Sequence, residues 1–248
     1  LDPGPGFGRG VRERDTLLFY GQKLSIKDRD VWNGGDFTDT NVYWLAAEAT
    51  DGLRMESASV APGPGGASAA FARTLHAETN DKDVIEAHIR PNGDLWFWSP
   101  AVFPGAPRSF GFAADALSGT GTAVLAVTLG GYTTGNHEVQ LALNGVAPTE
   151  GAALWSGRTA ATFTRTFPAA LLSGTNTLTL TTPLAGDVVF LDAFDVTYQR
   201  TFAAVSSRLL FTDGNVNAKY QSSSYATSPR LIDLSRRDAA TGLRLPRV

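Results

Sequence analysis

The chain has 248 residues, of which 43% are hydrophobic, 10% aromatic and 18% charged. This length and aromatic content exclude a disordered chain and allow one large β domain or a sandwich with flanking pieces. The net charge of −3, with scattered Lys and Arg, excludes the basic surface that nucleic-acid binding needs, and no apolar run is long enough for a membrane span. The lack of cysteine excludes disulfides, Cys-based metal sites and a Cys nucleophile.

Residues 1–68 are predicted to be an N-terminal lead-in followed by a β-hairpin segment. The Gly/Pro-rich start of the chain is expected to be irregular. Strand patterns occur in three stretches, 16–24, 41–49 and 53–60. Asp51-Gly52 is a hairpin signal between the last two, and the Pro/Gly-rich loop 61–69 marks the first domain boundary.

Residues 69–200 are predicted to be an antiparallel jelly-roll β-sandwich, so that the chain as a whole is all-β with flanking hairpin and extension segments. The sandwich begins with a strand at 69–80, in which Phe71, Arg73 and Leu75 recur with a period of two. Further strand patterns with turn signals at sandwich spacing follow in SFGFAADAL, AVLAVTLGGY, HEVQLALNG, ATFTRTFPAALL, TNTLTLTTP and DVVFLDAFDVTY. The last two are expected to form the closing hairpin of the sandwich.

Residues 201–248 differ in character and are predicted to be a C-terminal β extension or the start of a further domain. A strand is expected at 203–214 (AAVSSRLLFTDG), followed by polar, Ser/Tyr-rich sequence.

Several phrases of the chain together resemble a known family. They are LLFYGQ, FTDTNVYWL, GLRM, HAETND, DLWFW, LNG, GTNTLTL, DVVFLDAFDVTY and PRLIDL. Their order and spacing, from about Thr16 to Leu234, resemble the non-catalytic N-terminal region of bacterial gingipain-type cysteine peptidases. The resemblance implies an accessory domain of a secreted or cell-surface protein, whose partner is a downstream catalytic domain with a His and a Cys. A chain without cysteine cannot contain that dyad, and its start at Leu1 suits a piece or processed product of a longer protein.

The central part, Phe71 to Gln199, also resembles a carbohydrate-binding jelly roll of the galactose-binding type, through LNG, GTNTLTL and LDAFDV. This implies an alternative function as an independent carbohydrate-binding module with a glycan or cell-surface ligand. It also implies a structural calcium between the first and last strands, where Glu78 and Asp192 would supply carboxylate oxygens. The other interpretation of Asp192 is that it faces solvent or bonds a neighbouring turn. No further cofactor is expected.

Aromatic residues in loops are the candidate ligand contacts, because sugars stack their apolar faces on exposed rings. Trp32, beside Asn33-Gly34-Gly35, and Tyr132, between Gly131 and Thr133, are the two ligand-binding candidates. Trp44 and Trp96 are expected in the core, since aromatic residues dominate sandwich cores.

The three histidines, His76, His88 and His137, do not predict a reaction centre. His76 and Glu78 share a strand face and could bind a metal or move a proton, but polar positions on a solvated face explain them as well. No zinc-protease or α/β-hydrolase motif is present. We therefore expect no catalytic residue and no enzymatic activity, with a glycan-active hydrolase using two carboxylates as a third alternative.

Overall fold

The computed structural model describes residues 19, 21, 42–44, 64–84, 96–212 and 218–234. It divides the chain into two compact units, Leu1–Ala61 with Arg230–Val248, and Pro62–Pro229. In the first unit, the rings of Phe19 and Tyr43 pack with centroids 5.6 Å apart. The three strands expected before residue 61 lie almost entirely outside the described residues, and the boundaries at 68 and 200 stay predictions.

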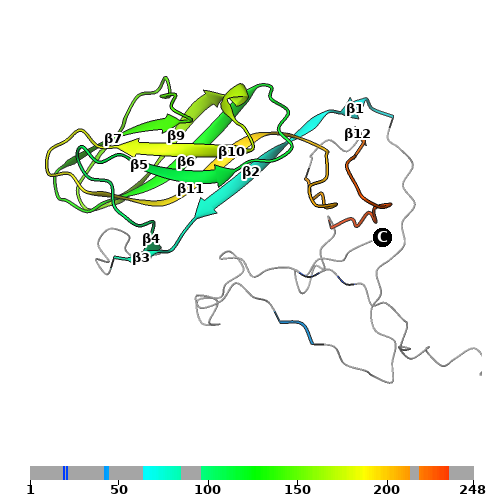
Figure 1. Cartoon of the computed structure of the whole chain (residues 1–248), viewed down its shortest axis with the longest axis horizontal. Coiled ribbons are helices and arrows are strands. Elements are labelled where there is room, and N and C mark those ends of the chain that lie inside the picture. Colours follow the sequence, from blue (N-terminus) through cyan, green and yellow to red (C-terminus); the bar gives the residue numbers. More distant parts are fainter. Residues whose placement is uncertain are drawn as a thin grey trace, which may run out of the picture. The chain divides into compact units, whose positions relative to one another are not determined.

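The second unit is built on two four-stranded antiparallel sheets that face one another (Figure 1). One sheet has the order β2 (Ala70–Glu78), β11 (Val189–Thr201), β6 (Thr122–Gly131), β9 (Ala160–Pro168). The other has the order β5 (Arg108–Ala113), β10 (Thr175–Thr181), β7 (Asn136–Leu143), β8 (Ala153–Ser156). The predicted antiparallel jelly-roll sandwich is thereby confirmed.

Three smaller elements flank the sheets. A parallel pair joins β1 (Ala67–Ser68) to β12 (Lys219–Tyr220), and an antiparallel pair joins β3 (Lys82–Asp83) to β4 (Trp96–Phe97). A 3₁₀ turn, η2 (Ala169–Leu171), lies between β9 and β10. Among the described residues, no helix is long and apolar enough to cross a membrane.

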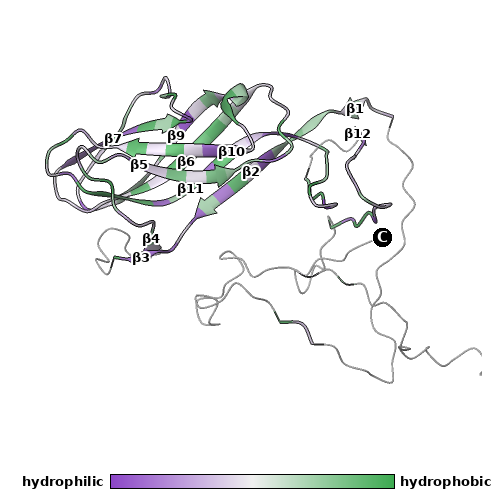
Figure 2. Ribbon diagram, viewed as in Figure 1, coloured by the Kyte–Doolittle hydropathy of each residue, from purple (hydrophilic) through white to green (hydrophobic). Residues whose placement is uncertain are grey.

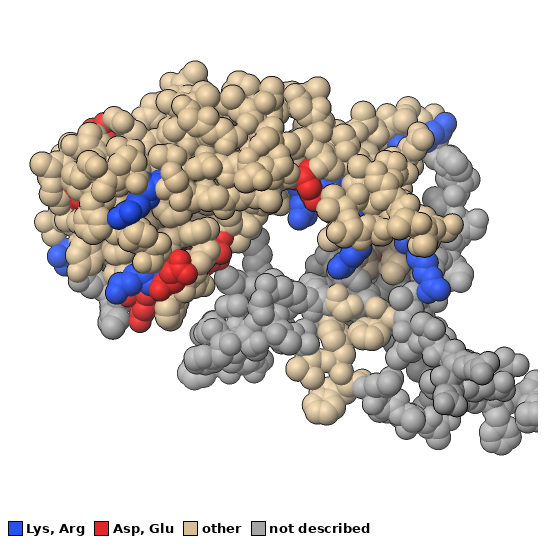
Figure 3. Space-filling model, viewed as in Figure 1, with Lys and Arg blue, Asp and Glu red and all other residues tan. Residues whose placement is uncertain are grey.

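The period-two alternation of the strands produces the core. Inward-facing side chains from both sheets are fully buried, among them Leu125, Leu129, Leu143, Phe167, Leu178, Leu180, Leu191 and Phe194. Outward positions are often hydroxyl residues that bond across strands, as in Thr74–Thr197 at 2.8 Å and Thr128–Thr162 at 2.9 Å. The alternation is visible in Figure 2, and Figure 3 shows a largely uncharged face with a cluster of acidic and basic side chains along its lower edge.

The expected hairpin of β10 and β11 is wrong, because the two strands belong to opposite sheets. The connection between them crosses from one sheet to the other and carries two buried polar residues, Thr182 and Asp187. A register shift between Leu191 and Ala193 then changes the inward-facing set of β11 from odd to even positions. This bulge explains why the apolar alternation of the strand is broken at Asp192.

The strand expected at 203–214 is also wrong for the described residues 203–212, which turn back instead. Val205 and Arg208 bond one another across a turn in which Ser206 and Ser207 have φ of 51° and 58°. Four rings then pack together with neighbouring centroids 5.0 to 5.7 Å apart, from Phe71, Phe202, Phe211 and Tyr220. The segment after β11 therefore packs against the sandwich through Phe71 of β2.

Candidate functional site

Three connections meet at one end of the sandwich, which we call the Tyr132 end. They are the β6–β7, β8–β9 and β10–β11 loops, and backbone hydrogen bonds join them to one another. Tyr132 N donates to Val188 O at 2.9 Å, and Gly157 N donates to Gly135 O at 2.9 Å. Gly131 N adds a bond to Thr159 O at 3.0 Å. The sequence therefore brings residues from three separate loops into one local structure.

A buried, hydrogen-bonded pair of side chains lies beneath these loops. His137 Nδ1 donates to Asp187 Oδ1 at 2.6 Å, and its Nε2 donates to Gly157 O at 3.0 Å. Gly157 O can only accept, so Nε2 is the donor in that contact. Asp187 also accepts hydrogen bonds from Thr182 Oγ1 at 2.8 Å and Thr133 Oγ1 at 3.4 Å. The His137 and Asp187 side chains are 0% and 1% exposed, which makes this a fully buried, multiply bonded pair.

The surroundings of His137 explain two further features of the sequence. A Cβ atom on Gly131 would overlap Nε2 of the His137 ring and lie 2.8 Å from Gly157 O, so only glycine fits there. The Trp155 ring stacks on His137 with centroids 4.6 Å apart and donates its indole N–H to Thr159 O at 3.3 Å. The sequence does not predict the His137–Asp187 pair. The available signal for a close backbone approach is the Gly130-Gly131 step, which precedes His137.

Tyr132 is half-buried at the edge of this structure. Its ring packs edge-on against Phe190 with centroids 5.9 Å apart, next to a small second core of Val84, Phe97, Ala101 and Phe190. The Arg158 guanidinium lies 5.7 Å from the Tyr132 ring centroid. We call this arrangement the Tyr132–Arg158 platform, and it joins an aromatic surface to an exposed cation. The ligand role expected for Tyr132 stays a prediction, and Trp32 lies outside the described residues.

The expectation that Trp96 and Trp44 are core residues is wrong. Trp96 is 44% exposed and Trp44 is 93% exposed. In β4, Phe97 is fully buried in the second core, and successive strand residues point to opposite faces. Trp96 consequently projects away from that core, paired in register with the exposed Asp83 of β3.

Glu78 and Asp192, the expected calcium ligands, lie on neighbouring strands. Glu78 is in register with Ala193, next to the bulge that contains Asp192. Asp192 is 2% exposed, which rules out the interpretation that it faces solvent. Two carboxylates suit Ca²⁺, but such a site needs more oxygen ligands, and backbone carbonyls would have to supply them. Within the described residues, no group of three or more acidic or histidine side chains could hold a metal ion.

His76 links Glu78 to a third carboxylate on the outer face of the sheet. Its Nδ1 lies 2.7 Å from Asp195 Oδ1, and its Nε2 lies 3.0 Å from Glu78 Oε2. Partial burial by itself lowers the pKa of His76, but the hydrogen bonds and charges of Glu78 and Asp195 together raise it above its usual value. The His76 side chain is 56% exposed, which agrees with the interpretation of a polar position on a solvated face.

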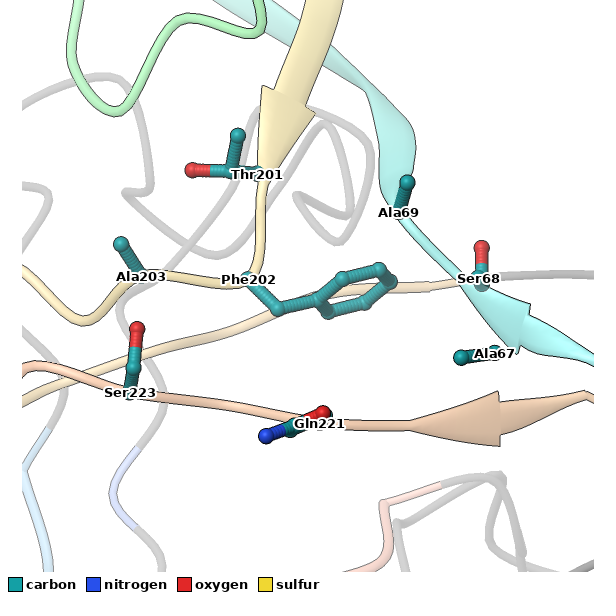
Figure 4. A pocket seen from close by; sticks show the side chains of 8 residues that line it. All are labelled: Ala67, Ser68, Ala69, Thr201, Phe202, Ala203, Gln221 and Ser223. Atoms are coloured by element: carbon teal, nitrogen blue, oxygen red, sulfur yellow. The ribbon is translucent and has the colours of Figure 1, made fainter.

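A separate open cavity of about 320 Å³ lies between the chain entering β2 and the chain leaving β11. Its lining is Ala67, Ser68, Ala69, Thr201, Phe202, Ala203, Gln221 and Ser223, and Figure 4 shows the Phe202 ring among these small side chains. No charged side chain lines it. Its chemistry therefore offers less for specific recognition than the Tyr132 end does.

Comparisons with known proteins concern the fold. No protein-family description and no curated protein matches the chain. Among solved structures, dimeric latent PorU from Porphyromonas gingivalis matches with a TM-score of 0.50 and 16% identity. That match covers 62% of this chain and 15% of the PorU chain, so this chain spans a small part of the length of PorU. At this identity the likeness shows a shared fold.

Two carbohydrate-binding modules match with lower scores. A CBM36 module in complex with calcium and xylotriose has a TM-score of 0.32 and 16% identity, covering 49% of this chain and 98% of that chain. A CBM35 module from Cellvibrio japonicus Abf62 has a TM-score of 0.33 and 20% identity, covering 54% of this chain and 92% of that chain. Scores this low do not establish the function of this chain.

Proposed function

We propose that the chain is a non-catalytic recognition domain that binds a glycan at the Tyr132 end of its sandwich. The observation that carries the proposal is the placing of aromatic rings and charged groups around one small core. Tyr132 packs against that core with Arg158 over its ring, and Trp96 projects from the strand that supplies Phe97 to it. The exposed carboxylates of Asp81 and Asp83 lie on the adjoining chain.

This combination suits a sugar. The C–H faces of a pyranose ring are apolar and stack on aromatic rings, whereas its hydroxyl groups need donors and acceptors nearby. Trp96 and Tyr132 would supply the stacking surface. Arg158 would donate hydrogen bonds and Asp83 would accept them.

The setting that we propose is an accessory domain of a secreted or cell-surface gingipain-like peptidase, whose catalytic domain lies elsewhere in the same protein. Two points support it. The phrases of the sequence resemble the N-terminal region of those peptidases, and the fold is similar to a part of PorU that makes up 15% of that chain. The alternative is an independent carbohydrate-binding module, which would bind its glycan without any partner domain.

Glycan binding is tested by affinity electrophoresis and glycan arrays with the purified chain. We expect Trp96→Ala and Tyr132→Ala each to weaken binding about tenfold or more, since stacked aromatic anchors contribute on the order of 2 kcal/mol. Leu154→Ala is the matched control, because Leu154 is 65% exposed on β8 and outside the proposed site. A chain that binds no glycan contradicts the proposal, and hydrolysis of a glycan panel would favour the glycan-active alternative.

A structural calcium at Glu78 and Asp192 is a second proposal, supported by the buried Asp192 carboxylate beside the end of β2. A cation held there would offset the cost of burying that charge. We expect calcium at one hundred times its Kd to stabilise the fold by about 2.7 kcal/mol, and chelator to lower the melting temperature. Glu78→Gln should abolish that difference, with the exposed Asp83→Asn as the control. Identical melting curves with and without chelator would remove the calcium.

A further inference from the structure

We infer that the buried His137–Asp187 pair positions the Tyr132–Arg158 platform for its ligand. This inference rests on the proposed function, because it concerns how the binding surface is held. The pair itself touches no ligand, so His137 and Asp187 are positioning residues.

The first step of the argument is that each half of the platform is tied to the pair. Thr133, directly after Tyr132, donates its hydroxyl to Asp187 at 3.4 Å. Gly157, directly before Arg158, accepts a hydrogen bond from His137 at 3.0 Å. The two platform residues are thus each one position from a residue that the pair holds.

The second step is that the pair connects all three loops of the Tyr132 end. His137 lies in β7, just after the β6–β7 loop, and Asp187 lies in the β10–β11 connection. The bond from His137 to Gly157 adds the β8–β9 loop. The backbone bonds between these loops form the surface layer of the same structure, with the pair as its buried centre.

The third step is that the pair tolerates little change. Asp187 accepts hydrogen bonds from His137, Thr133 and Thr182 and has no proton to give. An Asn at this position would direct an N–H group towards at least one of these donors. It would also leave one acceptor oxygen in place of two for these three donors.

The opposite end of the sandwich provides a matched control. There Arg200, which is 5% exposed, donates to Asp115 Oδ1 at 2.7 Å. Asp115→Asn weakens this pair, which also includes a buried charged side chain. The segments that this pair joins lie at the end of β11 that is far from Tyr132. A loss of binding that came only from lower stability would appear in both variants.

The experiment compares the unaltered chain with Asp187→Asn, Thr182→Val and Asp115→Asn, using the glycan that the unaltered chain binds most tightly on the array. Affinity is measured together with hydrogen exchange at the amides of Gly131, Tyr132 and Gly157. We expect Asp187→Asn to weaken binding about tenfold and to speed exchange at these amides. Thr182→Val, a milder change that removes one hydrogen bond to Asp187, should weaken binding a few-fold, and Asp115→Asn should alter neither quantity.

The inference is overturned if Asp187→Asn and Thr182→Val bind and exchange as the unaltered chain does, or if Asp115→Asn has the same effects as Asp187→Asn. If Asp187→Asn does not fold, Thr182→Val decides by the same two measurements. If the unaltered chain binds no glycan, the proposed function fails, and the exchange rates alone then decide whether the pair holds these loops.

Discussion

A hydrogen-bonded pair of ionisable side chains lies at each end of β11, and the two pairs have different surroundings. Asp187, just before the strand, pairs with His137, and Arg200, at its end, pairs with Asp115. Three of these four side chains are almost completely buried, whereas the Asp115 side chain is 48% exposed. The Asp187–His137 pair joins the connection before β11 to β7 of the opposite sheet. The Arg200–Asp115 pair joins β11 itself to the chain that follows β5 of the opposite sheet. β11 is the longest strand of the sandwich.

What differs is the position of the aromatic rings. At the Arg200 end, Phe71 lies beneath the Arg200 guanidinium, and the rings of Phe202, Phe211 and Tyr220 pack beside it. At the Tyr132 end, Trp96 projects outward. The comparison teaches that a buried charge pair by itself marks no site. We propose that recognition belongs to the Tyr132 end, where the exposed Trp96 and the Arg158 cation lie around the second core; at the Arg200 end the exposed Tyr220 ring packs against Phe202 and Phe211.

The largest loss of stability is expected from a change in the cluster of four rings at the Arg200 end. Phe202 is 3% exposed, and Phe202→Ala should lower the free energy of unfolding by about 4 kcal/mol, the usual cost of truncating a buried Phe. Urea unfolding measures this loss. Leu210→Ala is the control, expected within about 0.5 kcal/mol because Leu210 is 62% exposed.

The same packing bears on the boundary expected at residue 200. A chain that ends at Arg200 should be less stable than one that ends at Pro229, by at least the effect of Phe202→Ala. Equal stability of the two chains would show that residues 201–229 are a dispensable extension and would contradict the structural role of the ring cluster.

An intermediate effect is expected at the Tyr132 end from Gly131→Ala. The new Cβ atom would lie 2.8 Å from Gly157 O, a backbone atom that the buried pair holds in place. We expect a loss of about 2 kcal/mol, in the range of core overpacking. In Gly111→Ala, the matched change in β5, the nearest atom is 4.0 Å from the new Cβ. Similar unfolding curves for both variants would mean that the loops at the Tyr132 end shift to accommodate the new Cβ atom at little cost in stability.

The sheets could be predicted from the sequence because alternation is a local signal. The strand stretches from SFGFAADAL to DVVFLDAFDVTY all contain observed strands. Short β8 was missed, since four residues are too few for a period to show. The wrong hairpin has a different cause. Whether adjacent strands pair or cross to opposite sheets depends on a connection whose Asp187 is held by His137, fifty positions away.

The candidate site could be predicted only in part for the same reason. The loop composition around Tyr132 predicts a ligand contact there, but the contacts of Tyr132 with Arg158 and Phe190 join distant segments. Trp96 was assigned to the core because an aromatic strand residue does not reveal its face when the strand is two residues long. The Asp187–His137 pair has no sequence motif, and only Gly131 pointed towards a close backbone approach.

The smallest effect is expected from acid at the Arg200 end. The hydrogen bond from Arg200, opposed by partial burial and assisted by the charges of Arg200 and Arg73, lowers the pKa of Asp115 from its ordinary 3.8. Since the folded-state pKa lies below the unfolded-state value, the stabilisation is complete above the unfolded-state pKa. It is lost as the pH falls from about 3.8 through the lowered folded-state pKa. In Asp115→Asn, stability should therefore fall less steeply in this pH window than in the unaltered chain. The Asp115 side chain is 48% exposed, so high salt should reduce the difference by screening the ion pair. The measurement is urea unfolding of both proteins at low salt over this pH window. If the free energy of unfolding falls equally with pH in both, the pair at the Arg200 end acts through packing alone. The two ends of β11 would then resemble one another in the position of their pairs and not in charge.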